Sequence, residues 1–453
     1  MSHPDDIRRR KDVRTEIRRH VMKDIGQQRR RPRPPKRTAL VLPHTSSQQP
    51  NYSSQLRSTN PSNNTPSRSL APLGSFPIEA DSRVLELLNF AAAAPYQPFR
   101  DIWIEVAFCD PGAFHTTLGN TADFLRRING KDSSVNSREI SSHYALSVAQ
   151  LRRRLGSVAE STSEGAIANV LAHVCLTMRR CDWENWRVHM NGLTTISRIR
   201  GGFNNLRRQI LILILMYDLA GAMVFDSSPR FALPTDILGR PNTSLRGVPP
   251  RLQTLLLQLE QMPCDVSSAG EALRMTSTIA DVININSYST SFWKRDMDAI
   301  IMLGPCIHFL LSIPRLSNSL DTTNISEDLI AREIVRLVCL VIMSTLKESF
   351  AFFASERVAL QAKVSRFVPQ NAKRLGEKYF ELRIWALVTA ALLQQRDERG
   401  VYIQELRREM RALGVSTPHE LLEIARGIIW IDILMSPCAD ELMEDMKLDV
   451  AYR

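Results

Sequence analysis

Apolar residues recur at helical spacing along most of this chain, and that period restricts the fold more than any other feature. One set of apolar side chains steps by 4, 4, 3 and 4 positions and so shares one face of a helix: Ile140, Tyr144, Val148, Leu151 and Leu155. Comparable stripes begin at Ile167, Trp186, Ile330 and Ile384. No sustained period-2 alternation, the pattern of a half-buried strand, competes with them. The sequence therefore predicts an all-α fold, with one large multi-helix domain of stacked antiparallel helices over residues 78–453.

Three local patterns predict where individual helices begin and end. Residues 136–139 have the Asn-x-x-Glu spacing of a capping box ahead of the stripe that starts at Ile140. Residues 417–420 combine a Thr N-cap, a proline at the first helical position and a Glu at the third. The Gly201-Gly202 pair is typical of a helix end, because glycine readily adopts the left-handed conformation of a C-cap.

Charge is distributed unevenly along the chain. Residues 1–37 hold 14 Lys or Arg and 5 Asp or Glu, whereas the remaining residues hold 44 and 42, so the net charges are +9 and +2. We expect residues 1–37 to form a basic, partly helical arm. Residues 38–77 are rich in Ser, Pro and Asn and poor in apolar side chains. Burial cannot offset the entropy of ordering such a segment, so we expect a disordered linker.

The arm ends in a dense run of cations separated by prolines: Arg29, Arg30, Arg31, Arg33, Lys36 and Arg37. Such a run suits the acidic groove of an import receptor, which makes it a candidate nuclear import signal. A weak contact with DNA phosphates is the alternative, and a solvated tail without a partner is the third interpretation. No aromatic residue lies in residues 1–37, which argues against stacking on single-stranded bases.

Cysteine spacing argues against a metal site. The seven cysteines include no CxxC pair, and their number is odd. We therefore expect free, buried thiols. Cys175 and Cys181 are the closest pair, flanked by His173 and His189, but no third thiol is near and packing is the expected role. We expect no bound metal and no cofactor.

Patterns typical of enzymes and of membrane spans are missing as well. The chain has no GxSxG, HExxH, GxGxxG or Walker motif, so we expect no catalytic residue and no enzymatic activity. The apolar runs at residues 210–217 and 301–313 are shorter than the ~20 residues that a bilayer core requires, and they predict buried helices. We expect neither a membrane partner nor a secretory leader.

Two tryptophans mark the most distinctive predicted helix. Trp183 and Trp186 lie three positions apart, and Met190 and Leu193 continue their face. An aromatic stripe of this kind is typical of a contact between core helices rather than of a ligand cage.

This helix and its flanks resemble the fungal-specific transcription factor domain, the helical region found C-terminal to binuclear zinc clusters. The residues that follow the pattern in order are Asp182, Trp186, His189, Gly192, Leu193, Arg200, Gly201 and Gly202. The apolar run at 210–217, Asp218 and the stretch 229–234 look like the next helix and the Pro-Phe loop of that family. Residues 17–24 are similar to an Arg-His-Val-Met stretch near the start of related proteins.

The resemblance implies a nuclear transcription regulator with family-motif residues in structural roles. The zinc cluster that reads DNA in other members is not apparent, so the expected partners are other transcription factors or a second copy of the chain. Control of a metabolic gene set is what the resemblance implies for members without the cluster. Two alternatives stay open: a weakly specific DNA-binding factor that uses the arm, and a cytosolic helical adaptor without a transcriptional role.

Overall fold

Helices account for all the regular secondary structure in the described part of the chain. The computed structural model describes residues 76–93, 100–129, 134–234, 247–316, 325–352, 355–415 and 417–447. Those residues contain no strand, and the all-α prediction is confirmed. The described helices belong to one unit that spans residues 72–453. The basic arm at 1–37 and the linker at 38–77, apart from its last two residues, lie outside the described residues, and the domain boundaries stay a prediction.

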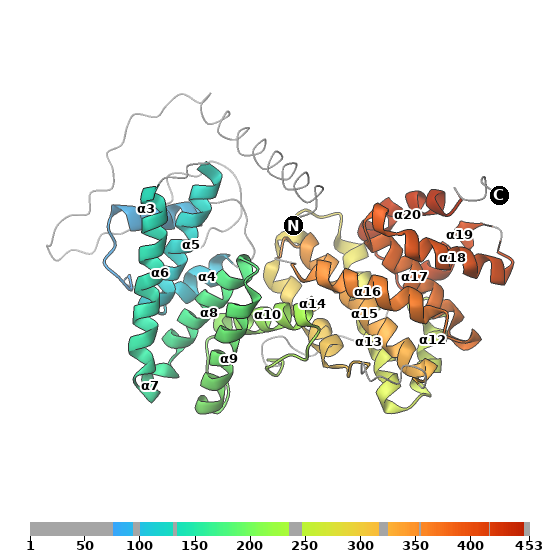
Figure 1. Ribbon diagram of the computed structural model, residues 1–453, viewed down its shortest axis with the longest axis horizontal. Helices are drawn as coiled ribbons and strands as arrows, with labels where there is room; N and C mark the ends of the chain where they lie inside the picture. Colours follow the sequence, from blue (N-terminus) through green and yellow to red (C-terminus); the bar gives the residue numbers. More distant parts are fainter. Residues whose placement is uncertain are drawn as a thin grey trace, which may run out of the picture. The chain divides into compact units, whose positions relative to one another are not determined.

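The first helices of this unit build a small core of their own around Leu87, Phe114, Leu118 and Ile140. They are α3 (Ser82–Ala93), α4 (Arg100–Ala107), α5 (Pro111–Asn129) and α6 (Ser134–Leu155). Helices α5 and α6 pack side by side along their length (Figure 1).

The capping box predicted at residues 136–139 is wrong. Helix α6 begins at Ser134, so Asn136 and Glu139 both lie inside the helix. Glu139 accepts two hydrogen bonds from the Arg83 guanidinium of α3, at 2.7 and 2.9 Å. The acid that looked like part of a cap is therefore a tertiary partner that joins α3 to α6.

Hydroxyl and carboxylate caps delimit the next helices, which are α7 (Val158–Ser161), α8 (Glu164–Arg179) and α9 (Trp183–Arg200). The Ser163 hydroxyl accepts from Ala166 N–H at the start of α8, and the Asp182 carboxylate accepts from Asn185 N–H at the start of α9. Helix α9 ends at Gly201, whose φ of 76° is in the left-handed region, as the glycine pair predicts.

Helix α10 (Arg208–Phe225) is apolar and long enough, at 18 residues, to cross a membrane by length and composition alone. Two thirds of its residues are buried in the fold, where it packs against α4, α8, α9, α14 and α16. The sequence placed the end of the apolar run at Asp218. The helix in fact continues for seven residues beyond it, because Leu219, Ala220, Ala222 and Met223 extend the buried surface and Asp218 is itself buried.

The C-terminal half is organised around α15 (Glu327–Ser349), in which every residue from Ile330 to Lys347 is buried. A helix buried on all sides needs packed neighbours on every face. These neighbours are α13 (Cys264–Asn286), α14 (Asp296–Ser312), α16 (Glu356–Ala372) and α17 (Phe380–Leu393). Further helices complete this half (Figure 1): α12 (Pro250–Glu260), α18 (Gly400–Leu413), α19 (Pro418–Arg426) and α20 (Asp432–Lys447).

Thr417 is the N-cap of α19 and Pro418 its first residue, as the sequence predicts. The Thr417 hydroxyl makes no hydrogen bond to the helix backbone and donates instead to the Glu420 carboxylate, at 3.1 Å.

A buried ionic cluster connects the end of α10 to α15 and α16. The Arg336 guanidinium is fully buried and donates to Asp226 at 2.6 and 2.9 Å and to Glu333 at 2.6 and 2.8 Å. Lys363 of α16 also pairs with Asp226. Burial opposes ionisation of Asp226, but its hydrogen bonds to Arg336 and Lys363 outweigh that cost and hold its pKa well below the usual range.

Candidate protein-interaction site

Helix α9 carries five of the nine family-motif residues that the sequence predicts, and its buried face packs on α10. Trp186 is only 1% exposed, and its ring lies so close to Gly221 of α10 that a Cβ there would come within 1.9 Å of it. Trp183 and Phe225 pack edge to face, with ring centroids 6.2 Å apart. The tryptophan pair therefore forms the helix–helix contact that the sequence predicts. The sequence analysis did not single out Gly221, although a small residue within an apolar helix could have indicated a close helix–helix contact.

Asp218 anchors the loop that follows α10. Its Oδ2 accepts hydrogen bonds from Arg230 N–H at 2.7 Å and Phe231 N–H at 3.0 Å. Burial raises the pKa of Asp218 to about 6. The Arg230 side chain donates to Asn191 Oδ1 of α9 at 2.6 Å. The structure thus brings Asp218 and the Pro-Phe loop together and connects both to the motif helix.

The C-terminal end of α9 is tied to the preceding helices. The Arg200 guanidinium donates to the carbonyl oxygens of Thr162 at 2.8 Å and Asn204 at 3.4 Å. These bonds join the end of α9 to the residue after α7 and to the turn after Gly201 and Gly202. Leu193 lies in the core, fully buried.

A buried Ser–His pair lies behind α9, between α5, α6 and α8. The Ser147 hydroxyl lies 3.0 Å from His173 Nε2 and 2.9 Å from Asn169 Oδ1, and it accepts from the Thr116 hydroxyl at 2.6 Å. Burial lowers the pKa of His173 to about 4. Ser147 is fully buried, and these three neighbours engage its hydroxyl. The geometry is that of a network that joins three helices.

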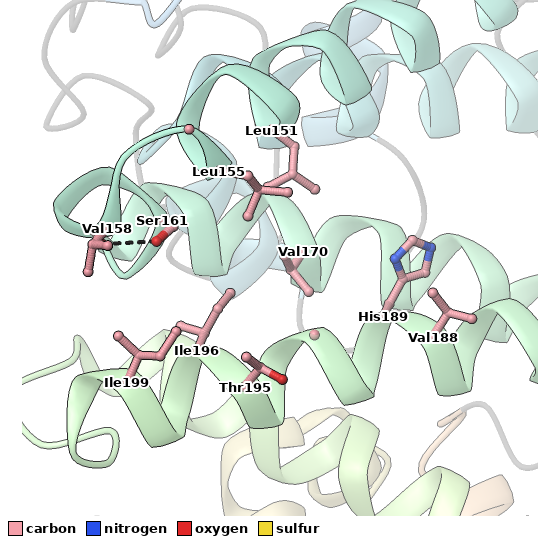
Figure 2. A pocket seen from close by; sticks show the side chains of 12 residues that line it. Leu151, Leu155, Val158, Ser161, Val170, Val188, His189, Thr195, Ile196 and Ile199 are labelled. Atoms are coloured by element: carbon pink, nitrogen blue, oxygen red, sulfur yellow. Dashed lines mark hydrogen bonds between the residues drawn. The ribbon is translucent and has the colours of Figure 1, made fainter.

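The outward face of α9 borders an open groove of about 500 Å³. One wall is α9, the other is the end of α6 with α7, and Val170 of α8 lies between them (Figure 2). Two motif positions, His189 and Gly192, line this groove, and Ile196 continues the same wall one turn further along the helix. The His189 ring stacks on His173 with centroids 5.4 Å apart, which connects the groove wall to the buried network.

The rim of the groove is apolar and exposed to solvent. Four of its side chains are more than half exposed: Leu155 at 57%, Val158 at 72%, Val188 at 62% and Ile199 at 55%. A solvated helix face normally carries polar residues, and a contiguous exposed apolar patch indicates an interaction site. Neither the groove nor the contribution of Leu155 and Val158 was expected from the sequence.

The remaining residues that the sequence singles out lie elsewhere. Arg29, Arg30, Arg31, Arg33, Lys36 and Arg37 are outside the described residues. Within the described residues, no group of three or more His, Cys, Asp or Glu is placed to hold a metal ion. The expectation of buried thiols holds for Cys306 and Cys339 and is wrong for Cys181, which is exposed in the turn between α8 and α9 with a φ of 56°.

A comparison with protein families identifies the family of the chain. The family described as the fungal specific transcription factor domain matches residues 82–351, from the first residue of α3 to just beyond α15. The match includes α9, the groove and the Asp218 loop, and it leaves out α16 to α20. No curated protein and no solved structure matches the chain. The chain belongs to the fungal specific transcription factor domain family.

Proposed function

We propose that the protein is a nuclear, non-enzymatic transcription regulator that acts through protein contacts. Family membership supports the regulatory role. The open apolar groove supports action through protein contacts. It is formed by the family-motif helix α9 together with α6 and α7. The expected partners are other transcription factors or a second copy of the chain, and the controlled genes form a metabolic set.

Nuclear localisation, in this proposal, depends on the cation run at residues 29–37. At 51.3 kDa, and more with a fluorescent fusion, passive diffusion through nuclear pores is slow. Replacing Arg29, Arg30, Arg31, Lys36 and Arg37 by Ala in the full-length fusion should leave the protein largely cytoplasmic. Undiminished nuclear accumulation would contradict the import role.

The regulatory role is tested by tethering. The full-length protein is fused to a heterologous sequence-specific DNA-binding domain and placed upstream of a reporter gene. We expect the reporter level to rise or fall at least severalfold relative to the DNA-binding domain alone. An unchanged reporter, with the fusion shown to be nuclear and folded, would favour the adaptor without a transcriptional role.

DNA binding through the arm is the second candidate function, supported by the net charge of +9 on residues 1–37. Such binding should be weak, with dissociation constants on the order of micromolar or worse, steeply salt-dependent and indifferent to sequence. Titration of labelled specific and scrambled duplexes at two salt concentrations, with the full chain and a chain starting at Phe76, measures it. Tight, sequence-selective binding by the shorter chain would defeat the partner-dependent proposal.

A further inference from the structure

The groove between α6 and α9 has the length and floor of a helix-binding site. Val188 and Ile199 line it 11 positions apart on α9, which corresponds to roughly 16 Å at 1.5 Å per residue. That length matches about three turns of a docked helix. Helix α8 packs against both α6 and α9, so Val170 forms the floor between two walls (Figure 2).

The exposure of its rim favours a macromolecular occupant over a small ligand. Pockets for small molecules enclose most of the surface of the ligand. Here Leu155, Val158, Val188 and Ile199 stand out from the floor and are mostly solvated. A helix laid along the groove covers all four with apolar anchors spaced at i, i+4 and i+7, whereas a compact ligand on Val170 leaves them in water.

Charge defines the chemistry of that helix. Residues 134–200, which supply every wall of the groove, hold nine Arg and five Asp or Glu, a net of +4. The rest of residues 38–453 hold 35 basic and 37 acidic residues, a net of −2. Three of the five acids are already engaged: Glu139 with Arg83, Glu164 with Arg207 and Asp182 as the cap of α9. The other two, Glu160 and Glu184, are exposed. Two of the nine arginines are engaged as well, Arg154 with Asp110 and Arg200 with backbone carbonyls.

Exposed arginines therefore outnumber exposed acids on the helices that form the groove. Arg152 and Arg153 are exposed on the last turn of α6, which ends at Leu155, and Arg198 is exposed one position before Ile199 on α9. A basic helix is repelled by this surface, and the basic arm at residues 1–37 is disfavoured as an occupant for the same reason.

We propose that this groove binds an acidic amphipathic helix of about three turns from a partner protein, with apolar anchors on one face and Asp or Glu beside them. The proposal rests on the proposed function, in that it names the chemistry of the partner through which the protein acts. Burial of the solvated rim side chains against the partner helix supplies the affinity, and the arginines select for acidic flanks.

The first experiment identifies the preferred sequence. A display library of randomised three- to five-turn helical peptides is selected on full-length protein and counter-selected on the Val188→Glu variant. Enriched peptides should combine an i, i+4, i+7 apolar stripe with net negative charge. The proposal is overturned if the enriched peptides are neutral or basic. It is also overturned if no enriched peptide binds the parent better than the variant.

The second experiment measures affinity with the most enriched peptide, synthesised with a fluorescent label. Val188→Glu should weaken binding at least tenfold, and so should replacing the acids of the peptide by Asn and Gln. Gly192→Gln is the second groove variant and should also weaken binding, because Gly192 lines the groove and a Cβ there meets no atom within 4 Å. Val358→Glu, at a position as exposed as Val158 but on α16, is the matched control and should stay within twofold.

The outcomes separate this proposal from the proposed function. If the parent binds no peptide and Val188→Glu dissociates a dimer in sedimentation, the groove binds a second copy of the chain. That result overturns the proposal of an acidic partner helix. A tethered reporter that responds while no acidic peptide binds refutes the groove assignment alone. Peptide binding with a silent reporter supports the groove and refutes transcriptional regulation.

Discussion

The region around α9 and the region around α15 bury their helices to different extents. Helix α15 is enclosed from Ile330 to Lys347, and its polar groups form a buried ionic cluster with Asp226. Helix α9 buries a single stripe, and its outer face borders a solvated apolar groove. Apolar surface stabilises a fold only where it is removed from water. Burial of apolar surface therefore stabilises the α15 region, whereas the groove beside α9 leaves apolar surface in contact with water.

The largest effect is expected in the ionic cluster. Arg336→Met leaves Asp226 and Glu333 buried without their main partner, and loss of one member of a buried pair costs about 3–5 kcal/mol. Urea unfolding measures the change. Arg295→Met is the control, because Arg295 and its partner Asp298 are each 63% exposed. Loss of this exposed ion pair should cost less than about 1 kcal/mol. Equal losses in the two variants would refute the special role of burial.

The contact between α9 and α10 should be the next most sensitive. Gly221→Ala places a Cβ against the Trp186 ring, and overpacking of this kind costs about 1–3 kcal/mol. Gly192→Ala, on the open side of α9, should be neutral or stabilising by about 0.5–1 kcal/mol, because alanine favours the helix and meets nothing. Trp186→Phe should partly relieve the Gly221→Ala variant. A Gly221→Ala protein that melts like the parent would show that the close contact is not tight.

A pH-dependent difference should appear at Asp218. Its pKa is raised from 3.8 to about 6 in the folded state, so its contribution to stability is complete below pH 3.8 and is lost as pH rises through 6. Relative to the Asp218→Asn variant, the parent should lose about 1 kcal/mol between pH 5 and pH 7.5. Other titrating groups, His173 among them, are common to both proteins and cancel.

Asp182→Asn is the matched control for that titration. The hydrogen bonds of Asn185 lower the pKa of Asp182, so its contribution is lost only as pH falls below the usual carboxyl range. Thermal melts of the parent and this variant should therefore differ by a constant amount between pH 5 and pH 7.5. A constant difference for Asp218→Asn as well would mean that Asp218 is ionised throughout that interval.

The smallest effect on stability is expected at the groove rim. Val188→Thr and Ile199→Thr should each change the free energy of unfolding by no more than about 0.5 kcal/mol, since both side chains are already solvated. Ile196→Thr, on the same helix but 5% exposed, should cost more than about 1 kcal/mol. Rim variants as damaging as Ile196→Thr would show that the groove side chains hold the fold together and are not reserved for a partner.

Local rules were sufficient for the helices and for several of their ends. The period of the stripes at Ile140, Ile330 and Ile384 reports helix content directly, because the faces of a helix repeat every 3.6 residues. Gly201 and Thr417 delimit their helices through backbone preferences that need no distant partner. The family resemblance was also readable, since it depends on the order of residues around Trp186.

Pairings between distant residues were decided only by the tertiary structure. The spacing of Glu139 suggested a cap, but the approach of Arg83, 56 positions away, gave the carboxylate a different partner. Gly221 and Asp218 have meaning only where α10 meets Trp186 and the Phe231 loop. Likewise, Leu155 and Ile199 are ordinary members of two amphipathic stripes until α8 holds α6 and α9 apart. Periodicity predicts that a side chain faces inward or outward, whereas the position of the next helix determines whether that side chain is buried or left at an open groove.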